Sequence, residues 1–397
     1  MTERPIRILF AIPSLDHGGP DRVLYELLRA LDRRRFAPSL MVSEPGGYYL
    51  ARLPPDIPVG VLGGATALAR RYPVLRALRF VRRAAPDLVF ATLRMNLTLG
   101  VVAPAFPRHT RLVLRQAIQA STDFAALIAQ AGIKHRVSRW ITRASLRRAD
   151  AVICQSEAMR ADLRALVGDH AGLHVIGNPI DVDAVRAAAR APVVLPGSPA
   201  LVSVARLAHL KGYDLLLPAI DRLRRSHPGI HLTVIGEGGE RPRLEALIRR
   251  LDLARHVALP GFSAEPLPAV RAADLFVLPS RYEAFPNAAL EALACGTPVV
   301  LTDCPGANAQ LVRPGFNGRL ARTATPDELV AAIAVALGER AGYDRTAISA
   351  DCAARFGAAQ ITARYEDVFA EVAGASPDSR AASGWARAWL REVHTKL

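Results

Sequence analysis

Several residue types and patterns are scarce in this chain. Among 51 basic residues, lysine occurs only as Lys134, Lys211 and Lys396. The four cysteines form no Cys-x-x-Cys pair, which argues against a disulfide framework and a zinc site. No apolar run approaches the roughly 18 residues of a membrane-spanning helix, and the first apolar stretch is too short for a signal peptide. We therefore expect a cytoplasmic protein.

The composition is that of a globular protein. Of 397 residues, 51% are hydrophobic and 22% are charged, which leaves room for two domains with substantial cores. The net charge of +15 comes almost entirely from arginine. These arginines are scattered, without interleaved aromatic residues or a nucleic-acid-binding motif, so we do not expect nucleic acid as a partner.

Predicted strands and helices alternate along the whole chain, which is typical of α/β proteins with parallel sheets. The predicted strands cover residues 6–12, 39–42, 88–91, 112–114, 151–154, 201–205, 231–235, 257–259, 275–278 and 299–301. The predicted helices cover residues 21–31, 74–84, 134–148, 157–166, 213–225, 243–251, 286–295 and 326–337.

This pattern divides into two doubly wound domains that face a central cleft. The first covers residues 1–180, and a segment rich in alanine and proline, 181–200, serves as the linker. The second domain covers residues 201–354, and the last segment, 355–397, is expected to return to the first domain. Ligands of such sheets bind at the carboxyl ends of the strands, so we expect the site in this cleft.

One segment, RYEAFPNAALEALACGTPVV at residues 281–300, combines a helix signal with two glutamates, Glu283 and Glu291. Pro286 suits the first turn of a helix, and Gly296 suits its end. Glu291 is then the one charge of an otherwise apolar helix and is expected to be buried. Glu283 precedes the helix, whose N-terminus offers free N–H groups to an anion.

Two other interpretations of this pair remain open. The helix can be an ordinary core element whose glutamate reaches water. The glutamates can also be the carboxylate pair of a glycoside hydrolase. If both were helical, they would lie roughly 12 Å apart along the axis. That spacing exceeds the roughly 5–9.5 Å of such enzymes, although a loop position for Glu283 weakens the argument.

Three further features fall where predicted strands end. Gly18 and Gly19 follow the first strand and precede a helix that opens with Asp21-Arg22. Arg206 and Lys211 follow the strand at 201–205, and paired cations suit a diphosphate. A glycine-rich run, Gly-Glu-Gly-Gly at 236–239, follows the next strand, but its spacing is not that of a dinucleotide-binding motif.

Together these segments resemble the retaining nucleotide-sugar glycosyltransferases of family 4, which have the two-domain GT-B fold. The resemblance rests on HGGPDRVLYELLRALDRRRF, SVARLAHLKGYDLLLPAI, VIGEGGERPRLEALIRRLDLARHVALPGF and RYEAFPNAALEALACGTPVVLTDCPG. The last of these, with seven residues between its two glutamates, is the most specific. The resemblance covers nearly the whole chain.

The resemblance implies roles for the matching residues. Arg206 and Lys211 would hold the donor diphosphate and stabilise the leaving nucleotide, and Glu291 would bind the ribose hydroxyls. Glu283 would meet the donor sugar, and Gly19, next to Gly18, would let the first domain close on the phosphate. The remaining donor-binding residues implied are Phe285, Pro286 and Asn287. No cofactor and no metal are expected, because the arginine and the lysine would supply the charge stabilisation.

The acceptor side is less well defined by the resemblance. Many relatives have a histidine or an acidic residue where this chain has Arg115-Gln116, so the group that assists the acceptor hydroxyl stays open. His17 and Asp16 are candidates for that group, and the leaving phosphate itself is another. A loop at Arg94–Asn96 is expected to line the acceptor side, with an ordinary turn as the alternative.

Two basic segments of the first half, 74–83 and 134–148, are predicted to form amphipathic helices. The second would place Val137, Trp140, Ile141 and Ala144 on one face. Such helices can lie on anionic membranes, although each apolar face can equally pack on its own domain. The tail, with Trp385 and Trp389, permits the same two interpretations.

The resulting hypothesis is a retaining hexosyltransferase that uses a nucleotide-diphosphate sugar, with UDP- or GDP-sugars as the donor class. Its acceptor would be a saccharide or a lipid-linked saccharide in polysaccharide or lipopolysaccharide assembly. Peripheral contact with the inner face of the membrane is part of this hypothesis. A nucleotide-sugar epimerase or a glycogen-type phosphorylase on the same fold is the main alternative. A non-catalytic binding protein is the third. A phosphorylase would need a pyridoxal lysine in the second domain, where Lys211 is the one lysine.

Overall fold

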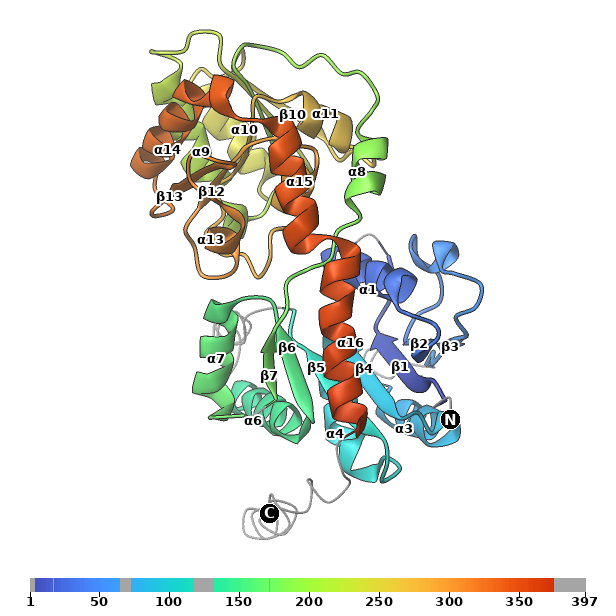
Figure 1. Cartoon of the computed structure of the whole chain (residues 1–397). Coiled ribbons are helices and arrows are strands. Elements are labelled where there is room, and N and C mark those ends of the chain that lie inside the picture. The colour runs from blue at the N-terminus through green and yellow to red at the C-terminus, as the bar shows by residue number, and fades with distance from the viewer. Residues whose placement is uncertain (1–3, 17, 65–72, 118–131, 171, 375–397) are drawn as a thin grey trace.

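The computed structural model describes residues 4–16, 18–64, 73–117, 132–170 and 172–374, which form two α/β domains (Figure 1). The first domain contains a seven-stranded parallel sheet with the order β3-β2-β1-β4-β5-β6-β7. Its strands are β1 (Ile6–Ile12), β2 (Phe36–Val42), β3 (Val59–Val61), β4 (Leu88–Thr92), β5 (Arg111–Arg115), β6 (Ala151–Cys154) and β7 (Leu173–Val175). Its helices are α1 (Gly19–Ala30), α3 (Val74–Ala84), α4 (Arg94–Val102), α6 (Gly132–Arg148) and α7 (Glu157–Val167).

Both faces of this sheet are covered, as the apolar strands require. Alternate side chains of β1 enter opposite core layers, because successive residues of a strand point to opposite faces. Leu9 packs with residues of α3, α4 and α7, whereas Phe10 packs with residues of α1 and of a C-terminal helix, α16 (Ala358–Gly374). A sheet buried on both sides explains why its strands read as nearly continuous apolar runs.

The second domain has a six-stranded parallel sheet with the order β10-β9-β8-β11-β12-β13. Its strands are β8 (Ala200–Val204), β9 (His231–Ile235), β10 (Val257–Gly261), β11 (Leu275–Leu278), β12 (Val299–Thr302) and β13 (Gly318–Ala321). Its helices are α9 (Tyr213–Leu223), α10 (Arg241–Arg250), α11 (Leu267–Ala272), α12 (Asn287–Ala294), α13 (Asn308–Leu311), α14 (Pro326–Gly338) and α15 (Arg345–Phe356). Short 3-10 turns occur at Leu50–Arg52, Ala103–Ala105, His209–Lys211 and Arg340–Gly342.

The chain passes between the domains twice, and the two passages touch. The first leads from β7 to α8 (Val182–Ala188), and the second joins α15 to α16. They pair at Ile180 and Gly357, where the Ile180 N–H donates to the Phe356 carbonyl at 3.0 Å and the Ala358 N–H donates back at 2.9 Å. The predicted linker 181–200 therefore contains a helix, which Asp181 caps through the Ala184 N–H.

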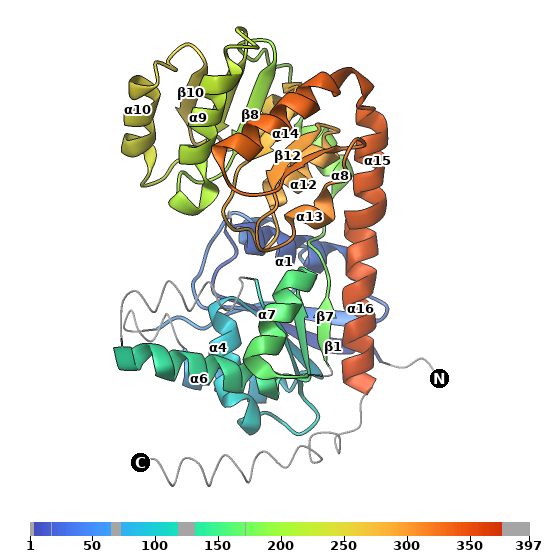
Figure 2. The same cartoon turned by 90° about the vertical axis from the view of Figure 1, so that its left-hand side faces the viewer.

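The long helix α16 lies along the first domain, as both views show (Figures 1 and 2). Tyr365 and Phe369 are fully buried, and Phe369 makes edge contacts with Phe10, Phe36 and Phe90. The Asp32 N–H donates to Glu366 at 2.8 Å. The helix therefore completes the first domain's core, although it comes last among the described elements.

The sequence-based strands and helices agree with the structure apart from small shifts at their ends. The missed strands are the short β3, β7 and β13, which lack a continuous apolar run. The predicted loop at 94–96 is wrong, because those residues begin α4 directly after β4, through Leu93 at φ 56°. No helix among the described residues is long and apolar enough to cross a bilayer.

Candidate functional site

The site is built around the start of α12. The loop 279–286 follows β11, and Pro286 occupies the N-cap, so the helix begins at Asn287 rather than at the proline. Arg281 fixes this loop to the second domain, because its guanidinium binds both oxygens of Asp214 at 2.7 and 2.9 Å. Phe285 is buried against Phe356 of α15. The first turn of α12 is thus held by side chains on both sides.

Glu283 lies in this loop and is buried, with 7% of the residue exposed. One of its oxygens, Oε1, accepts from the Lys211 ammonium at 2.5 Å and from the Ser280 hydroxyl at 2.7 Å. Gly306 pairs with Glu283 along the backbone at φ 137°, and a Cβ at Gly306 would overlap the Glu283 carbonyl. The carboxylate is therefore compensated by a cation and held by tight backbone packing.

Glu291 lies one turn into α12 and is only partly buried, with 17% of its side chain exposed. Arg22, from α1 of the first domain, donates its Nη1 to Glu291 Oε1. The expectation that Glu291 is buried is therefore met only in part, and Glu283 is the more buried of the two. The reason is that Glu291 faces the neighbouring domain, where Arg22 compensates its charge.

Lys211 and Arg206 follow β8. Lys211 ends a 3-10 turn, His209–Lys211, and Gly212 continues at φ 71° into α9. Its ammonium is mostly buried, whereas the Arg206 side chain is exposed and has no hydrogen bond or ion pair within the described residues. The glycine-rich run at 236–239 supports this loop, because the Glu237 carbonyl accepts from the Leu207 N–H at 2.9 Å.

Gly19 brings the first domain to the start of α12. A Cβ at Gly19 would lie 2.7 Å from the Asn287 Nδ2 atom, which is too close for a side chain. Gly18 caps α1, and its N–H donates to Asp21 at 3.2 Å. Burial raises the pKa of Asp21, although N–H groups of Asp16 and Gly18 oppose the shift. Gly19 thus permits a close approach of α1 to Asn287, and its expected closure on a donor phosphate stays a prediction.

A chain of hydrogen bonds crosses from the first sheet to α12. Arg115, buried at the end of β5, donates to Asn178 at 2.7 Å, and Asn178 donates to Asn287 at 2.7 Å. Arg115 also donates to the Tyr365 hydroxyl at 3.1 Å. From the sequence, Arg115 was named only as a residue that differs from those of many relatives, and Asn178 was missed. The available signal was a charged side chain at the end of a strand that is otherwise buried.

The residues expected on the acceptor side each contact a different part of the first domain. Arg94 lies 4.0 Å from Glu44, and Asn96 is buried, where its amide donates to the Arg115 carbonyl at 2.9 Å. Asp16 accepts from the Tyr48 N–H at 3.1 Å, so this carboxylate helps to hold the loop. His17 lies outside the described residues.

Among the described residues, no three His, Cys, Asp or Glu side chains gather as a metal site would require. Asp181 and Asp183 form an Asp-x-Asp pair in the sequence. Asp181 is the cap of α8 and lies 3.6 Å from Arg29. Asp181 therefore serves the passage between the domains.

The arrangement is suited to an anionic ligand with hydroxyl groups. Free N–H groups at the start of α12 and the Lys211 ammonium are donors for phosphate oxygens. Glu291 is an acceptor for hydroxyl groups, and Arg206 adds an unpaired cation nearby along the β8 loop. All of these groups follow the carboxyl ends of β8 and β11, where ligands of such sheets bind.

Comparison with known proteins identifies the family of this chain. Residues 17–184 match the model of Glycosyltransferase Family 4, and residues 186–350 match that of Glycosyl transferases group 1. The chain belongs to the family 4 glycosyltransferases. Its two parallel-sheet domains have the GT-B fold of that family, and its two halves correspond to the two matched models.

Several characterised proteins resemble parts of this glycosyltransferase. A glycogen synthase of Mycobacterium tuberculosis is 35% identical over 222 residues, or 54% of this chain and 51% of that protein. The lipopolysaccharide core biosynthesis glycosyltransferase LpsE of Rhizobium meliloti is 32% identical over 185 residues, 46% of this chain and 53% of that protein. The chain thus spans about half the length of these relatives.

Over a longer stretch of 302 residues, the chain is 26% identical to a Campylobacter jejuni protein. That protein is an N-acetylgalactosamine-N,N'-diacetylbacillosaminyl-diphospho-undecaprenol 4-alpha-N-acetylgalactosaminyltransferase, and the match covers 74% of this chain and 79% of the relative.

Solved structures share the fold. Anabaena Alr3699/HepE in complex with UDP has a TM-score of 0.73 at 22% identity, covering 92% of this chain and all of that one. A sucrose-phosphate synthase from Thermosynechococcus elongatus has a TM-score of 0.76 at 20% identity, covering 94% of this chain and 100% of the other. At these low identities, the similarity shows only that the two-domain fold is shared.

Proposed function

We propose that this glycosyltransferase moves a sugar from a nucleotide-diphosphate donor to a saccharide or lipid-linked saccharide, with retention of the anomeric configuration. The observation that carries the proposal is the Lys211–Glu283 pair beside the start of α12, where the first domain makes close contact through Gly19. A helix start with a lysine binds a diphosphate, and two carboxylates supply acceptors for sugar hydroxyls.

In this proposal each residue acts on charge or position. Lys211 and Arg206 stabilise the negative charge that develops on the leaving diphosphate. Glu283 holds Lys211 in place and faces the donor sugar, and Glu291 accepts from the ribose. The cations take the part that a metal ion has in other transferases, so we propose that the reaction needs no metal.

The donor class is supported by ligands seen in solved structures of the same fold. HepE was solved with UDP and with UDP-glucose. The acceptor class is supported by names among the relatives, which include lipopolysaccharide core assembly and a diphospho-undecaprenol-linked saccharide. No feature of the site or of the comparisons favours the epimerase alternative.

Contact with an anionic membrane, and hence a place at its inner face, is part of the proposal. On α3, Ala77 and Val81 pack into the core while Leu75 is exposed, and on α6, Trp140 is exposed while Ala144 is buried. The side chain of Val137 lies outside those described. Exposed Leu75 and Trp140 on basic helices are the apolar contacts that an interfacial helix uses.

A panel of nucleotide sugars tests the proposal. The protein is incubated with UDP- and GDP-linked hexoses, and release of the free nucleotide diphosphate is followed. We expect slow hydrolysis of one donor. NMR should show that the released sugar retains the anomeric configuration of the donor. Inversion at that carbon would contradict retention, and conversion of the donor into its epimer without nucleotide release would support the alternative.

A further inference from the structure

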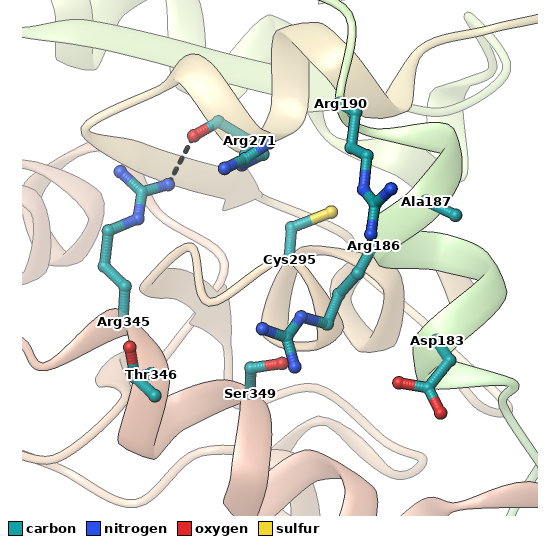
Figure 3. Close-up of a pocket in the computed structure, with 9 residues that line it drawn as sticks. All are labelled: Asp183, Arg186, Ala187, Arg190, Arg271, Cys295, Arg345, Thr346 and Ser349. Atoms are coloured by element: carbon teal, nitrogen blue, oxygen red, sulfur yellow. Dashed lines mark hydrogen bonds between the residues drawn. The ribbon is translucent and has the colours of Figure 1, made fainter.

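A pocket lies apart from the proposed donor site, between α8 and the second domain (Figure 3). It has a volume of about 1040 Å³ and lies between α8, α11, the end of α12 and the start of α15. Its lining residues are Asp183, Arg186, Ala187, Arg190, Arg271, Cys295, Arg345, Thr346 and Ser349. Cys295 closes α12 at the end opposite Asn287, so this pocket and the donor site occupy the two ends of one helix.

Two of the four arginines in this pocket are fixed by protein groups. Arg345 donates to the carbonyls of Arg271 and Ala273 at 2.5 and 3.2 Å and to the Thr297 hydroxyl at 2.7 Å. Arg271 donates to the Ala189 carbonyl at 3.5 Å, at the end of α8. Their hydrogen-bond partners are carbonyls and a hydroxyl, which orient both guanidinium groups without neutralising them. Asp274, which is not part of the pocket lining, attracts the Arg345 charge.

Of the other two arginines, Arg186 lies on α8 and Arg190 follows its end. Across the described residues, no hydrogen bond or ion pair joins the side chains of Arg186 or Arg190 to a protein group. Figure 3 shows the Arg186 guanidinium beside Ser349, across the pocket from Arg345. Asp183 is the one carboxylate in the lining and lies on the α8 side, so the lining itself carries four positive charges and one negative charge.

Like charges that are gathered in one pocket repel each other, and the repulsion is relieved when an anion binds between them. Guanidinium groups bind phosphate oxygens in pairs through their planar fork of N–H donors. We propose that this pocket binds a compact anion with two or more negative charges, of the phosphate-ester or diphosphate class. The ligand would lie between Arg186 and Arg190 on one side and Arg271 and Arg345 on the other.

The pocket also lies beside both passages between the domains. α8 begins two residues after Ile180, and α15 ends at Phe356, next to Gly357, to which Ile180 is paired. A ligand that bridges the arginines of α8 to Arg345 would therefore join the helices that follow the first passage and precede the second. The volume suits a small molecule, because pockets of roughly 300–1,000 Å³ hold such ligands.

The test uses inorganic pyrophosphate and the full chain. Pyrophosphate is titrated calorimetrically at constant ionic strength onto the unmodified protein and onto the double variant Arg186→Gln/Arg190→Gln. Loss of charge-assisted hydrogen bonds from both arginines is expected to weaken this binding about tenfold or more. A second double variant, Arg249→Gln/Arg250→Gln, removes the same charge from exposed positions of α10 and should bind as the unmodified protein does.

Cys295 provides a readout within the pocket. Burial raises the pKa of its thiol to about 11, so its alkylation by neutral iodoacetamide is followed by mass spectrometry at about pH 9. Pyrophosphate should slow this alkylation several-fold in the unmodified protein and in the α10 variant, but not in the α8 variant. The buried Cys154, Cys304 and Cys352 are internal references.

The donor site is a second place where pyrophosphate can bind, and Lys211→Ala separates the two sites. Protection of Cys295 that persists in this variant supports the pocket. The proposal would be overturned if pyrophosphate no longer protected Cys295 in the Lys211→Ala variant but still protected it in the Arg186→Gln/Arg190→Gln variant. Equal weakening by the α8 and α10 variants would also overturn it, because total charge alone would then account for the effect.

Discussion

At the residue scale, the two glutamates of the motif differ in what compensates their charge. Glu283 is held by Lys211 and Ser280 within its own domain, whereas Glu291 is paired with Arg22 of the other domain. A buried carboxylate is stable only when it is paired and hydrogen-bonded. The pairing of Glu283 therefore belongs to the second domain alone, and the pairing of Glu291 depends on how the domains meet.

Lys211→Ala should reduce turnover about 100-fold or more, because it removes charge stabilisation from the leaving diphosphate. It also leaves Glu283 with Ser280 as its remaining side-chain partner, so circular dichroism must show that the variant is folded. Arg249→Ala, which removes an exposed charge on α10, is the control for net charge. Unchanged turnover in a folded Lys211 variant would show that the lysine is structural.

Glu291→Gln and Glu283→Gln should separate nucleotide binding from chemistry. A hydrogen bond to a charged group contributes roughly 1.5–3 kcal/mol, so Glu291→Gln should weaken nucleotide-diphosphate binding about 10- to 100-fold. Because the ribose stays bound in the transition state, the effect should fall mainly on the donor KM. Glu283→Gln should lower kcat more than nucleotide affinity, since the free nucleotide lacks the sugar.

The structure adds a control to this experiment. Arg22→Gln breaks the pair with Glu291 but leaves the carboxylate in place. Calorimetry with the nucleotide diphosphate should show a smaller loss of affinity for Arg22→Gln than for Glu291→Gln. Equal losses would mean that Glu291 acts through the pairing of the domains and does not touch the ribose.

At the scale of elements, α12 is the meeting point of the two domains. Its first residue, Asn287, contacts Gly19 of α1 and accepts from Asn178 of the first passage, and its second turn carries Glu291. Residues from two distant segments, α1 and the first passage, therefore set the position of one short helix. A change at any of them should act on closure of the cleft more than on the stability of either sheet.

Gly19→Ala tests this view. The new Cβ would lie 2.7 Å from Asn287 Nδ2, and Asn287 cannot turn away without losing its bond to Asn178. We expect turnover to fall about tenfold or more, because small displacements of positioned groups are costly. Affinity for the nucleotide diphosphate should change much less. Gly239→Ala, where a Cβ would meet nothing within 4 Å, should leave both unchanged; a matching loss there would contradict this account.

Helix α16 should contribute strongly to the stability of the first domain. Phe369 is fully buried among Phe10, Phe36, Phe90 and Tyr365. Phe369→Ala should lower the free energy of unfolding by about 3–5 kcal/mol, as measured by urea denaturation. Asp367→Ala, on the exposed side of the same helix, should change it little. Equal effects of the two changes would indicate that α16 is not part of this core.

At the scale of the whole molecule, the chemistry is proposed to depend on the protein's own cations. Activity measured with excess EDTA should therefore equal that in its absence, because Arg206 and Lys211 would supply the stabilisation that a metal gives elsewhere. Loss of activity on chelation, restored by magnesium or manganese, would refute this part of the proposal. A chelator saturated with calcium beforehand controls for effects of the reagent itself.

Much of the architecture could be predicted from the sequence, because its physical causes are local. Alternating apolar strands and amphipathic helices define two parallel sheets, and the positions of Gly18, Arg206, Lys211 and Glu283 after predicted strands locate the ligand-binding edge. The strands β3, β7 and β13 were missed because each contains a glycine, a histidine or an arginine and therefore lacks the continuous apolar run of the equally short β6, β11 and β12. Helix α4 was missed because Leu93 turns directly from strand to helix without a glycine or proline signal.

Only the tertiary structure decided which charges meet. Arg22 and Glu291 are 269 residues apart, and Arg115 reaches Asn287 through Asn178 of the first passage. Four arginines share one pocket because α8, α11 and α15 pack around the end of α12. Local sequence determines helices, strands and loop chemistry, since these depend on near neighbours. Pairing between distant segments depends on how completed elements pack, and this pairing made Glu283, not Glu291, the more buried carboxylate of the motif.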